Sequence, residues 1–320
     1  MEARVLVPLA ITGQPPAWGQ LIHELRGETM GTSWSVRLVA PAELRLASIE
    51  AAIQRVLDEV IAEMSHWEPN SLLSRFNRAP AGSRHVLPSG FASVMDAALT
   101  VAAASEGAFD PTALELVQRW GFGPPGETIG GRCDWRALQW RDGELLQNGS
   151  ARLDLSAIAK GHAVDRVCRL LLECGVSHHL VEIGGELRGC GLKPDGSPWW
   201  VDVEFPSADS GLAPMRIALH GLAIASSGDY RRCYLDAQGQ RRSHTLDPRT
   251  CTPIAHGLAA VSVVHESAMW ADGWSTALMV LGWADGRRFA QERGLAALFV
   301  QRVGDGFEEH MSPACLELLA

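Results

Sequence analysis

Apolar residues in this chain recur at two spacings, one typical of helices and one typical of strands. Between residues 49 and 64 they repeat every three or four positions, which predicts a long amphipathic helix with one face in the core. Similar patterns predict helices over 91–104, ending at Glu106-Gly107, and over 268–281.

Shorter apolar and β-branched runs predict the strands. The first covers residues 21–38 and contains a turn at 27–31. Because strands are mixed with a few long helices instead of alternating with them regularly, the pattern favours the α+β class. Further strands are expected over residues 179–183, 199–205, 215–220, 222–226, 258–264 and 295–301.

One junction between a strand pattern and a helix pattern carries a chemical signal. A β-like run at 151–155 breaks at small residues into a helical pattern that continues to residue 174. Such a junction directs backbone N–H groups and the positive end of the helix dipole at whatever lies in front of it. Lys160, one of only two lysines in the chain, stands there, and its compact charge suits a phosphate group. An anionic ligand is the natural candidate.

Composition limits the function classes. A hydrophobic content of 47% is that of an ordinary globular protein, and a formal net charge of -9 argues against general nucleic-acid binding. No basic cluster exceeds a pair such as Arg231-Arg232 or Arg241-Arg242, so a polyanionic ligand must be held locally by a metal ion or by backbone amides. The seven cysteines are odd in number and contain no C-x-x-C, which indicates buried reduced thiols and neither a zinc site nor a disulfide framework.

The chain ends show no periodicity. Residues 1–22 are expected to form a flexible N-terminal arm, 23–303 the main domain and 304–320 a C-terminal tail. The apolar run 5–11 is too short for a secretion signal and contains Pro8, and no run approaches the roughly 18 residues of a membrane span. A cytoplasmic protein is expected.

Asp272 and Thr276 stand four residues apart in the third predicted helix, so their oxygens share one face. A carboxylate with a hydroxyl is a hard-oxygen pair that Mg²⁺ binds while keeping water and substrate phosphate. The alternative is that Asp272 caps the helix and Thr276 bonds back to its backbone, which the spacing alone favours.

Three other segments have both a chemical and a structural interpretation. His244, three residues before Asp247 in a loop stopped by Pro248, has the pKa range of a general base, although a given histidine is more often a surface or capping residue. Asp110 reads as the N-cap of a helix over 112–120. Trp67, at a helix end, offers a ring for stacking, although a core or rim tryptophan is more frequent.

The familiar nucleotide and hydrolase motifs are missing from the sequence. It contains no G-x-x-x-x-G-K-[ST], H-E-x-x-H or G-x-S-x-G. The pair Gly184-Gly185 closes a predicted strand and permits close approach of a ligand or another strand.

Taken in order, eight short segments resemble the FAD:protein FMN transferase family, the ApbE-like flavin transferases. They span about residues 27–282, nearly the whole chain. The segments are Thr29–Thr32, Ser65–Ser71 with Ser74–Asn77, Gly107–Thr112 with Trp120–Gly123, Asp154–Asp165, Gly184–Glu186, Ser226–Tyr230, Ser243–Arg249 and Ala271–Thr276.

The resemblance implies a fold, an activity and a set of site residues. The fold is a single compact α+β unit of two packed α/β subdomains, and 23–303 becomes the transferase domain. The implied base is His244, assisted by Asp247. Mg²⁺ is held by Asp272, Thr276 and the carbonyl of Ala157, with Ser275 nearby. The FAD site is lined by Met30, Trp67, Ala108, Phe109, Asp110, Asp154, Lys160 and Leu246.

The implied reaction is Mg²⁺-dependent transfer of FMN from FAD to a threonine or serine hydroxyl of an acceptor flavoprotein, releasing AMP. Hydrolysis of FAD to FMN and AMP, or flavin binding without turnover, needs a similar site and is the alternative. The chain departs from the family pattern at Asn70, where an acidic residue is usual, at Ser156-Ala157 and at His162, often a tyrosine. At Cys251 glycine is usual, and its loss is expected to reshape the loop that holds His244.

Overall fold

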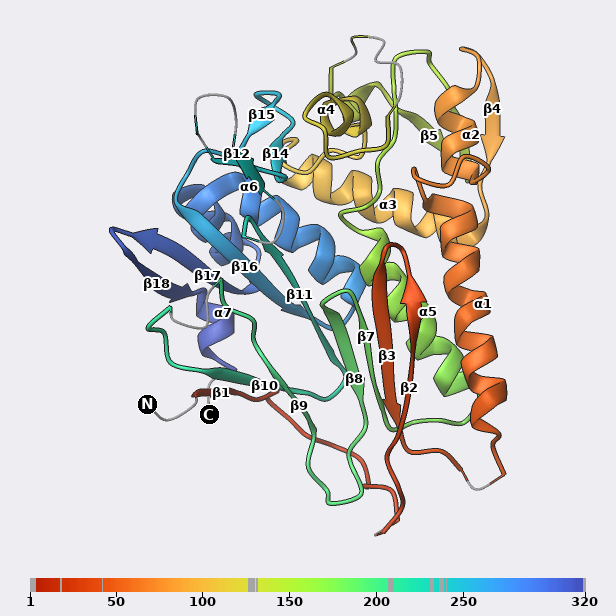
Figure 1. Cartoon of the computed structure of the whole chain (residues 1–320), viewed down its shortest axis with the longest axis vertical. Coiled ribbons are helices and arrows are strands. Elements are labelled where there is room, and N and C mark those ends of the chain that lie inside the picture. Colours follow the sequence, from red (N-terminus) through yellow and green to blue (C-terminus); the bar gives the residue numbers. More distant parts are fainter. Residues whose placement is uncertain are drawn as a thin grey trace.

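An eight-stranded antiparallel sheet forms the centre of the molecule (Figure 1). The computed structural model describes residues 4–17, 19–41, 43–125, 130, 132–206, 210–230, 233–235, 239 and 241–318. The strands follow one another across the sheet in the order β18 (Gly306–Met311), β17 (Ala296–Val303), β16 (Leu258–His265), β11 (Leu222–Gly228), β8 (Glu186–Cys190), β7 (His179–Ile183), β3 (Thr32–Leu38) and β2 (His23–Thr29).

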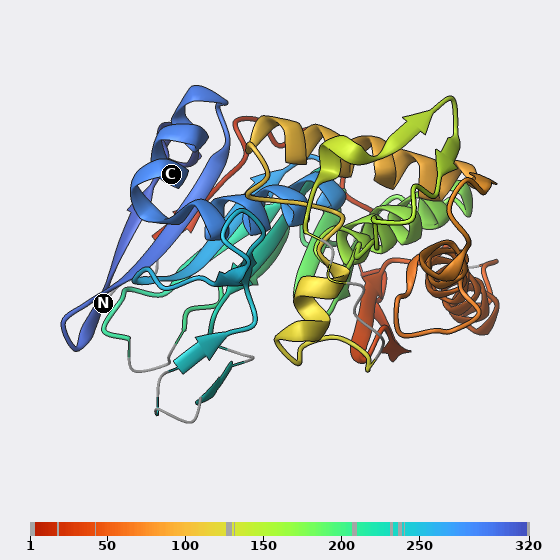
Figure 2. The same cartoon turned by 90° about the horizontal axis from the view of Figure 1, so that it is seen from above.

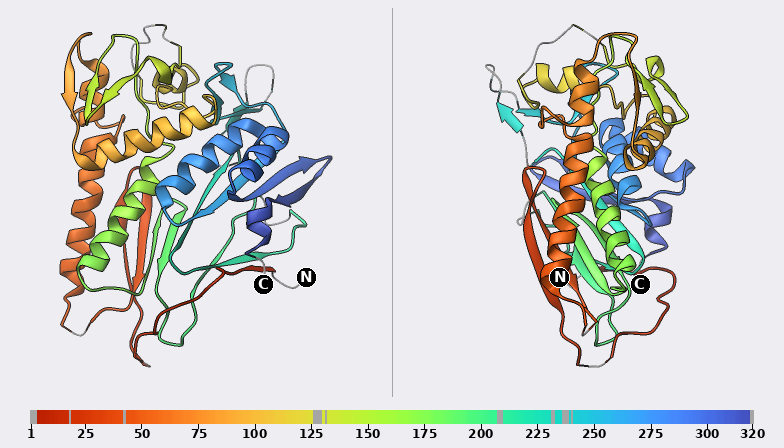
Figure 3. Two further views of the ribbon diagram at one scale, coloured as in Figure 1. Left: turned by 180° about the vertical axis from the view of Figure 1, so that it is seen from behind. Right: turned by 90° about the vertical axis from the view of Figure 1, so that its right-hand side faces the viewer.

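Three long helices cover one face of this sheet (Figure 3). They are α1 (Leu46–Met64), α5 (Ala159–Glu173) and α6 (Ala268–Glu292). The stripe predicted for the first helix is buried against α5 and the strands β3 and β7. The helix expected to end at residue 281 has a kink at Gly282, where φ is 78°, and then continues to its observed end.

A small sheet covers part of the opposite face. It contains β1 (Arg4–Leu6), β10 (Met215–Leu219) and β9 (Trp199–Asp202). Leu6 and Trp199 are buried in the core between the two sheets. The first residues are therefore not a flexible arm throughout, because β1 pairs with β10 and buries an apolar side chain.

The C-terminal boundary also needs correction. The segment beyond residue 303 was expected to be a tail, yet it supplies β18, which pairs along its whole length with β17, and α7 (Pro313–Leu316). Ser312 caps this last helix and its hydroxyl also bonds to the backbone of Ala297, which ties the segment to the sheet.

A second subdomain packs against α6 through α3 (Ser89–Ala104), as Figure 2 shows from above. Its core joins the core beneath α6, so the two α/β subdomains form one unit, and the predicted α+β class is confirmed. Its other elements are α2 (Leu72–Arg78), α4 (Leu114–Arg119), the 3-10 helix η1 (Trp135–Ala137) and a sheet of β4 (Arg84–Val86), β6 (Glu144–Leu146) and β5 (Gln139–Arg141).

Two local predictions were wrong. Residues 151–155 form an extended loop and not a strand, because their backbone bonds go to residues such as Pro111 instead of a neighbouring strand. Asp110 does not cap a helix, since α4 begins at Leu114 after the N-cap residue Ala113.

Two hairpins complete the described fold, β12 (Cys233–Leu235) with β13 (Arg241–Ser243) and β14 (Leu246–Asp247) with β15 (Thr252–Pro253). Among the described residues, no helix has the length and apolar character needed to cross a membrane.

Candidate active site

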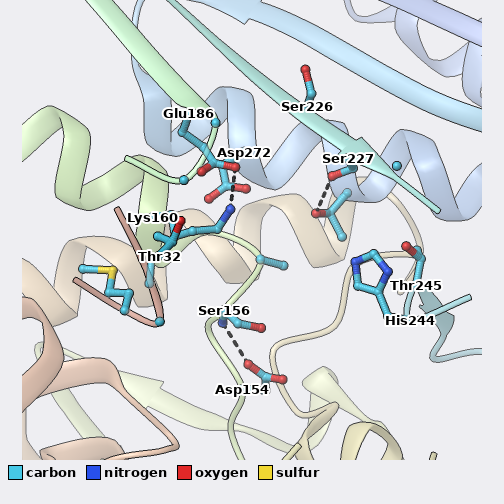
Figure 4. Close-up of a pocket in the computed structure, with 18 of the residues that line it drawn as sticks. Thr32, Asp154, Ser156, Lys160, Glu186, Ser226, Ser227, His244, Thr245 and Asp272 are labelled. Carbon is cyan, nitrogen blue, oxygen red and sulfur yellow. Dashed lines mark hydrogen bonds and ion pairs between the residues drawn. The ribbon is translucent and has the colours of Figure 1, made fainter. Parts of the chain in front are cut away.

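A cavity of about 1070 Å³ lies where the central sheet, the first turns of α5 and α6 and the second subdomain meet (Figure 4). Twelve of the fourteen residues expected at the site line it, although they come from segments far apart in the chain. Ser275 is fully buried behind this wall, and Asp247 is not among the lining residues. The twelve are Met30, Trp67, Ala108, Phe109, Asp110, Asp154, Ala157, Lys160, His244, Leu246, Asp272 and Thr276.

Lys160 lies in the first turn of α5, as predicted, and forms an ion pair with a residue to which the sequence assigned no role. Its Nζ lies 2.6 Å from Oε1 of Glu186, the first residue of β8. The Glu186 side chain is 3% exposed and that of Lys160 is 31% exposed. Gly184, with φ of 61°, begins the tight turn before Glu186, and a Cβ there would clash with Thr32 at 2.8 Å. The Gly-Gly-Glu segment was noted in the sequence, but only the tertiary fold brings Glu186 next to Lys160.

Asp272 is held by the neighbouring helix and does not cap its own. The N-cap of α6 is Ser267, whose hydroxyl accepts a hydrogen bond from the Trp270 N–H. Oδ2 of Asp272 accepts a hydrogen bond from the backbone N–H of Gly161 at 3.0 Å. The structural alternative for this residue is therefore excluded.

Thr276 and Ser275 face a serine on β11. The Ser227 hydroxyl lies 3.1 Å from Oγ1 of Thr276 and 2.8 Å from Oγ of Ser275. It is Ser275, and not Thr276, that donates back to the helix, to the carbonyl of Asp272 at 2.9 Å. Ser227 thus completes a group of hydroxyls beside Asp272.

Burial changes the acidity of the two carboxyl groups in this corner. Desolvation raises the pKa of Glu186 to about 7, although Lys160 acts in the opposite direction and Asp272 reinforces the rise. Desolvation likewise raises the pKa of Asp272, and again Lys160 opposes the change. Oε2 of Glu186 is buried and, among the described residues, has no hydrogen-bond partner. Two desolvated carboxyl groups beside one lysine form a site short of positive charge.

The N-terminal parts of α5 and α6 are fixed to one another by a partly buried carboxylate. Asp165 on α5 accepts hydrogen bonds from the N–H groups of Ala268 and Met269 and from the Ser267 hydroxyl, and it pairs with Arg188. At Gly161 a Cβ would stand 2.2 Å from the Ala268 carbonyl oxygen, so only glycine permits this approach. The contact places Lys160 and Asp272 in the same corner.

A second ionisable pair forms another wall. Nδ1 of His66 lies 3.2 Å from Oδ1 of Asp154, and both side chains are 6% exposed. Burial would lower the pKa of His66, but the Asp154 carboxylate outweighs burial and the pKa is raised. Burial would raise the pKa of Asp154, yet His66 and the Ser156 N–H hold it below the ordinary value. His66 stood in a matched segment, but nothing in its spacing linked it to Asp154.

The segment 108–110 forms a compact wall. Asp110 accepts hydrogen bonds from the N–H and hydroxyl of Thr112, at 2.8 and 2.7 Å, and from the Trp135 N–H at 3.2 Å. Burial nevertheless raises the pKa of Asp110. Trp67 is 57% exposed at the cavity, an unusual state for so large an apolar ring and one suited to stacking on a planar ligand.

One residue of the cavity lining, Met30, and one residue outside it, Cys251, are non-glycine residues with left-handed backbones. Met30 (φ 50°) and Gly31 (φ 71°) form the two-residue turn between β2 and β3 and line the cavity. Cys251 has φ of 58°, in the left-handed region that favours glycine. The loop before it keeps its turn, because the Cys251 N–H donates to the Asp247 carbonyl at 2.8 Å. The left-handed backbone at this non-glycine residue is a source of local strain.

His244 lines the cavity from the loop before β14, and its ring makes a T-shaped contact with that of Phe122, with centroids 6.2 Å apart. Asp247 directs both carboxylate oxygens at Arg249, at 2.9 and 2.8 Å. This ion pair between Asp247 and Arg249 stabilises the loop that follows His244. Figure 4 shows His244 on a different wall from Lys160 and Glu186.

Comparison with known proteins agrees with this architecture. The solved apo structure of the flavinyl transferase ApbE from Pseudomonas stutzeri matches with a TM-score of 0.85 and 35% identity, over 93% of this chain and 96% of that one. The flavin transferase ApbE from Vibrio cholerae matches with a TM-score of 0.84 and 33% identity, over 93% and 99%. The fold is therefore that of the ApbE flavin transferases.

The sequence agrees with the structural match. The sequence model of the ApbE family matches residues 30–299. The FAD:protein FMN transferase of Klebsiella pneumoniae is 33% identical over 305 residues, which is 90% of this chain and 87% of the relative. That of Vibrio cholerae is 36% identical over 301 residues, 90% of each chain. The chain belongs to the ApbE family.

Proposed function

We propose that this protein transfers the FMN part of FAD to a threonine or serine hydroxyl of an acceptor flavoprotein, in an Mg²⁺-dependent reaction that releases AMP. The acceptor oxygen forms a bond to the FMN phosphorus while the bond from that phosphorus to the AMP phosphate oxygen breaks. The proton of the hydroxyl goes to His244. The observation that carries the proposal is the convergence of twelve expected residues on one cavity.

The cavity suits FAD in size and in the chemistry of its walls. Its volume of about 1070 Å³ is at the upper end of the range for small-molecule sites. Trp67 offers an exposed ring to the isoalloxazine or adenine, and Phe109 closes the apolar side. Lys160 supplies a cation at the N-terminal turn of α5, where the helix dipole also favours the pyrophosphate.

The corner around Asp272 suits a divalent cation. Asp272 and Thr276 provide hard oxygens, Ala157 adds a carbonyl from the turn before α5, and Oε2 of Glu186 is a buried oxygen without a hydrogen-bond partner among the described residues. When bound, Mg²⁺ would neutralise part of the negative charge of the pyrophosphate. Ser275 and Ser227 hold the Thr276 hydroxyl in place.

His244 is the proposed base. It lies at the cavity wall on a loop braced by Asp247 and Arg249, and an imidazole accepts a proton from a hydroxyl near neutral pH. In this proposal Asp247 assists His244 by holding the loop. The protein itself has little covalent chemistry to perform in this reaction. Positioning of the two substrates therefore supplies most of the acceleration.

One incubation separates transfer from its two alternatives. The purified protein, FAD and Mg²⁺ are combined with an acceptor flavoprotein and with the same acceptor carrying alanine at its flavinylation site. Transfer predicts an acceptor mass increase equal to FMN minus water, with an equal amount of AMP. Free FMN and AMP without modified acceptor would indicate hydrolysis, and FAD recovered intact would indicate binding alone.

A further inference from the structure

Three side chains with metal-binding atoms meet on the helix-covered face of the sheet. They are Cys168 on α5, His179 at the start of β7 and Cys190 at the end of β8. A ring nitrogen of His179 and the two sulfur atoms all lie within 4.8 Å of one another. None of the three lines the catalytic cavity.

The register of the sheet explains this meeting. His179 and Cys190 are direct partners in the antiparallel pairing of β7 with β8, so their side chains emerge on the same face. α5 covers that face and places Cys168 over the pair. The sequence spacing, ten residues between successive members, has no zinc-motif signature, so the cysteine pattern alone indicated no such site.

The histidine is oriented as a metal ligand would be. Its Nδ1 lies 2.9 Å from the Val176 carbonyl oxygen, which can only accept, so Nδ1 carries the proton and Nε2 keeps its lone pair. His179 is 0% exposed, and its Nε2 has no hydrogen-bond partner among the described residues. Donation of one ring N–H to a backbone carbonyl is the usual support for a metal-bound imidazole.

The electrostatic surroundings favour a thiolate at Cys190. Hydrogen bonding from Cys168 lowers the pKa of Cys190 despite its burial, and the Arg188 guanidinium adds to the effect. Burial raises the pKa of Cys168, which therefore keeps its proton until a cation displaces it. A site with two sulfur ligands and one imidazole selects a thiophilic cation over Mg²⁺.

We propose that Cys168, His179 and Cys190 bind one Zn²⁺ ion, with the fourth coordination position left to a water molecule. The ion joins α5 to the β7–β8 hairpin. Lys160 lies at the other end of α5, and Glu186 lies at the other end of the hairpin. By fixing α5 to the hairpin, the metal would stabilise the arrangement that positions this ion pair. The proposal does not depend on the proposed transferase activity.

Zinc titration of the untagged protein tests the site. The protein is reduced, stripped with a chelator, desalted, and titrated with Zn²⁺ against a chromophoric chelator with Mg²⁺ in excess, which occupies hard-oxygen sites. We expect one tightly held equivalent in the wild type, and at least about a 10-fold loss of affinity in Cys190→Ser and His179→Gln. Cys174→Ser, at the C-terminal cap of the same helix, is the matched control and should bind like the wild type.

Two further measurements keep the test decisive if a variant folds poorly. Co²⁺ added to the stripped wild type should give the thiolate charge-transfer absorption, and Zn²⁺ should abolish it. Zn²⁺ should also raise the melting temperature of the wild type more than that of Cys190→Ser. Absence of a tight equivalent, equal uptake by Cys190→Ser, or a native Cys168–Cys190 disulfide that persists without metal would overturn the proposal.

Discussion

The carboxylate of Asp272 on α6 accepts a hydrogen bond from the Gly161 N–H on α5, at 3.0 Å. The proposed metal ligand is thereby fixed to the helix turn that carries Lys160. This one side chain has an observed structural role, because its acceptor oxygen joins two helices, and a proposed second role, in which its charge binds the cation. Two substitutions separate them.

Asp272→Asn keeps a carbonyl oxygen for Gly161 and removes the charge, whereas Asp272→Ala removes both. We expect both variants to lose Mg²⁺-dependent FMN transfer by at least about 10²-fold, since several kcal/mol of charge stabilisation disappear. Only the alanine variant should lose folding stability, by about 1–3 kcal/mol, because it leaves a buried N–H unsatisfied. Transfer assays at saturating Mg²⁺ and thermal unfolding check the two effects. Wild-type transfer by Asp272→Asn would rule out the metal assignment.

Glu186 should make stability depend on pH. Burial raises its pKa in the folded state to about 7, above the ordinary 4.5, so the folded protein holds the proton more tightly than the unfolded chain. Its contribution is fully present below pH 4.5 and is lost as pH rises toward 7. We therefore expect the metal-free wild type to lose more stability than Glu186→Gln between pH 5 and pH 8.

Denaturant unfolding at both pH values measures this difference. Glu308→Gln, which changes an exposed carboxylate on β18, serves as the control and should follow the wild type. Parallel pH dependence in the wild type and Glu186→Gln would show that the Glu186 carboxyl titrates like an exposed one.

His244→Gln should slow transfer by about 10²–10⁴-fold with little change in FAD affinity, the usual result of losing a general base. Single-turnover transfer and FAD titration separate the two effects. His310→Gln, on β18 and outside the cavity lining, is the control. Loss of FAD affinity at an unchanged maximal rate would make His244 a ligand contact, and the base would then lie elsewhere.

Lys160→Met should weaken FAD binding by about 10- to 100-fold, the effect of losing a charge-assisted hydrogen bond. Lys160→Arg should not restore affinity, because a planar guanidinium cannot replace a compact ammonium against the buried Glu186 carboxylate. Lys193→Arg changes the only other lysine and provides the control. Titration with FAD in the presence of Mg²⁺ measures the affinity of each variant. Wild-type FAD affinity in Lys160→Arg would show that only a positive charge is required at this position.

Cys251→Gly should raise the free energy of unfolding, by less than about 1 kcal/mol. Glycine relieves the left-handed strain at φ of 58° but gains freedom in the unfolded chain, so the two effects partly cancel. Cys251→Ala keeps the strain and should bring no gain. Denaturant unfolding of the three proteins checks this, and a destabilised glycine variant would mean that the thiol contact with Pro248 outweighs the strain.

Local pattern alone determined much of this protein. The helical stripe from Ile49 to Met64 and the part of α6 before its kink at Gly282 were predicted because side-chain periodicity reports directly which face is buried. The short matched segments likewise identified most of the residues that line the cavity. At 151–155 the same reasoning failed, since an extended apolar run looks alike in a strand and in a buried loop.

Only the tertiary structure decided which distant residues meet. Lys160 with Glu186, His66 with Asp154 and the Cys168 cluster each join segments whose separation carries no periodic signal. Their contacts depend on strand register and on how closely two helices approach, which Gly161 permits and Asp165 fixes. The pKa values of Glu186 and Asp272 follow from the same packing, because desolvation is a property of the assembled core and not of the residue.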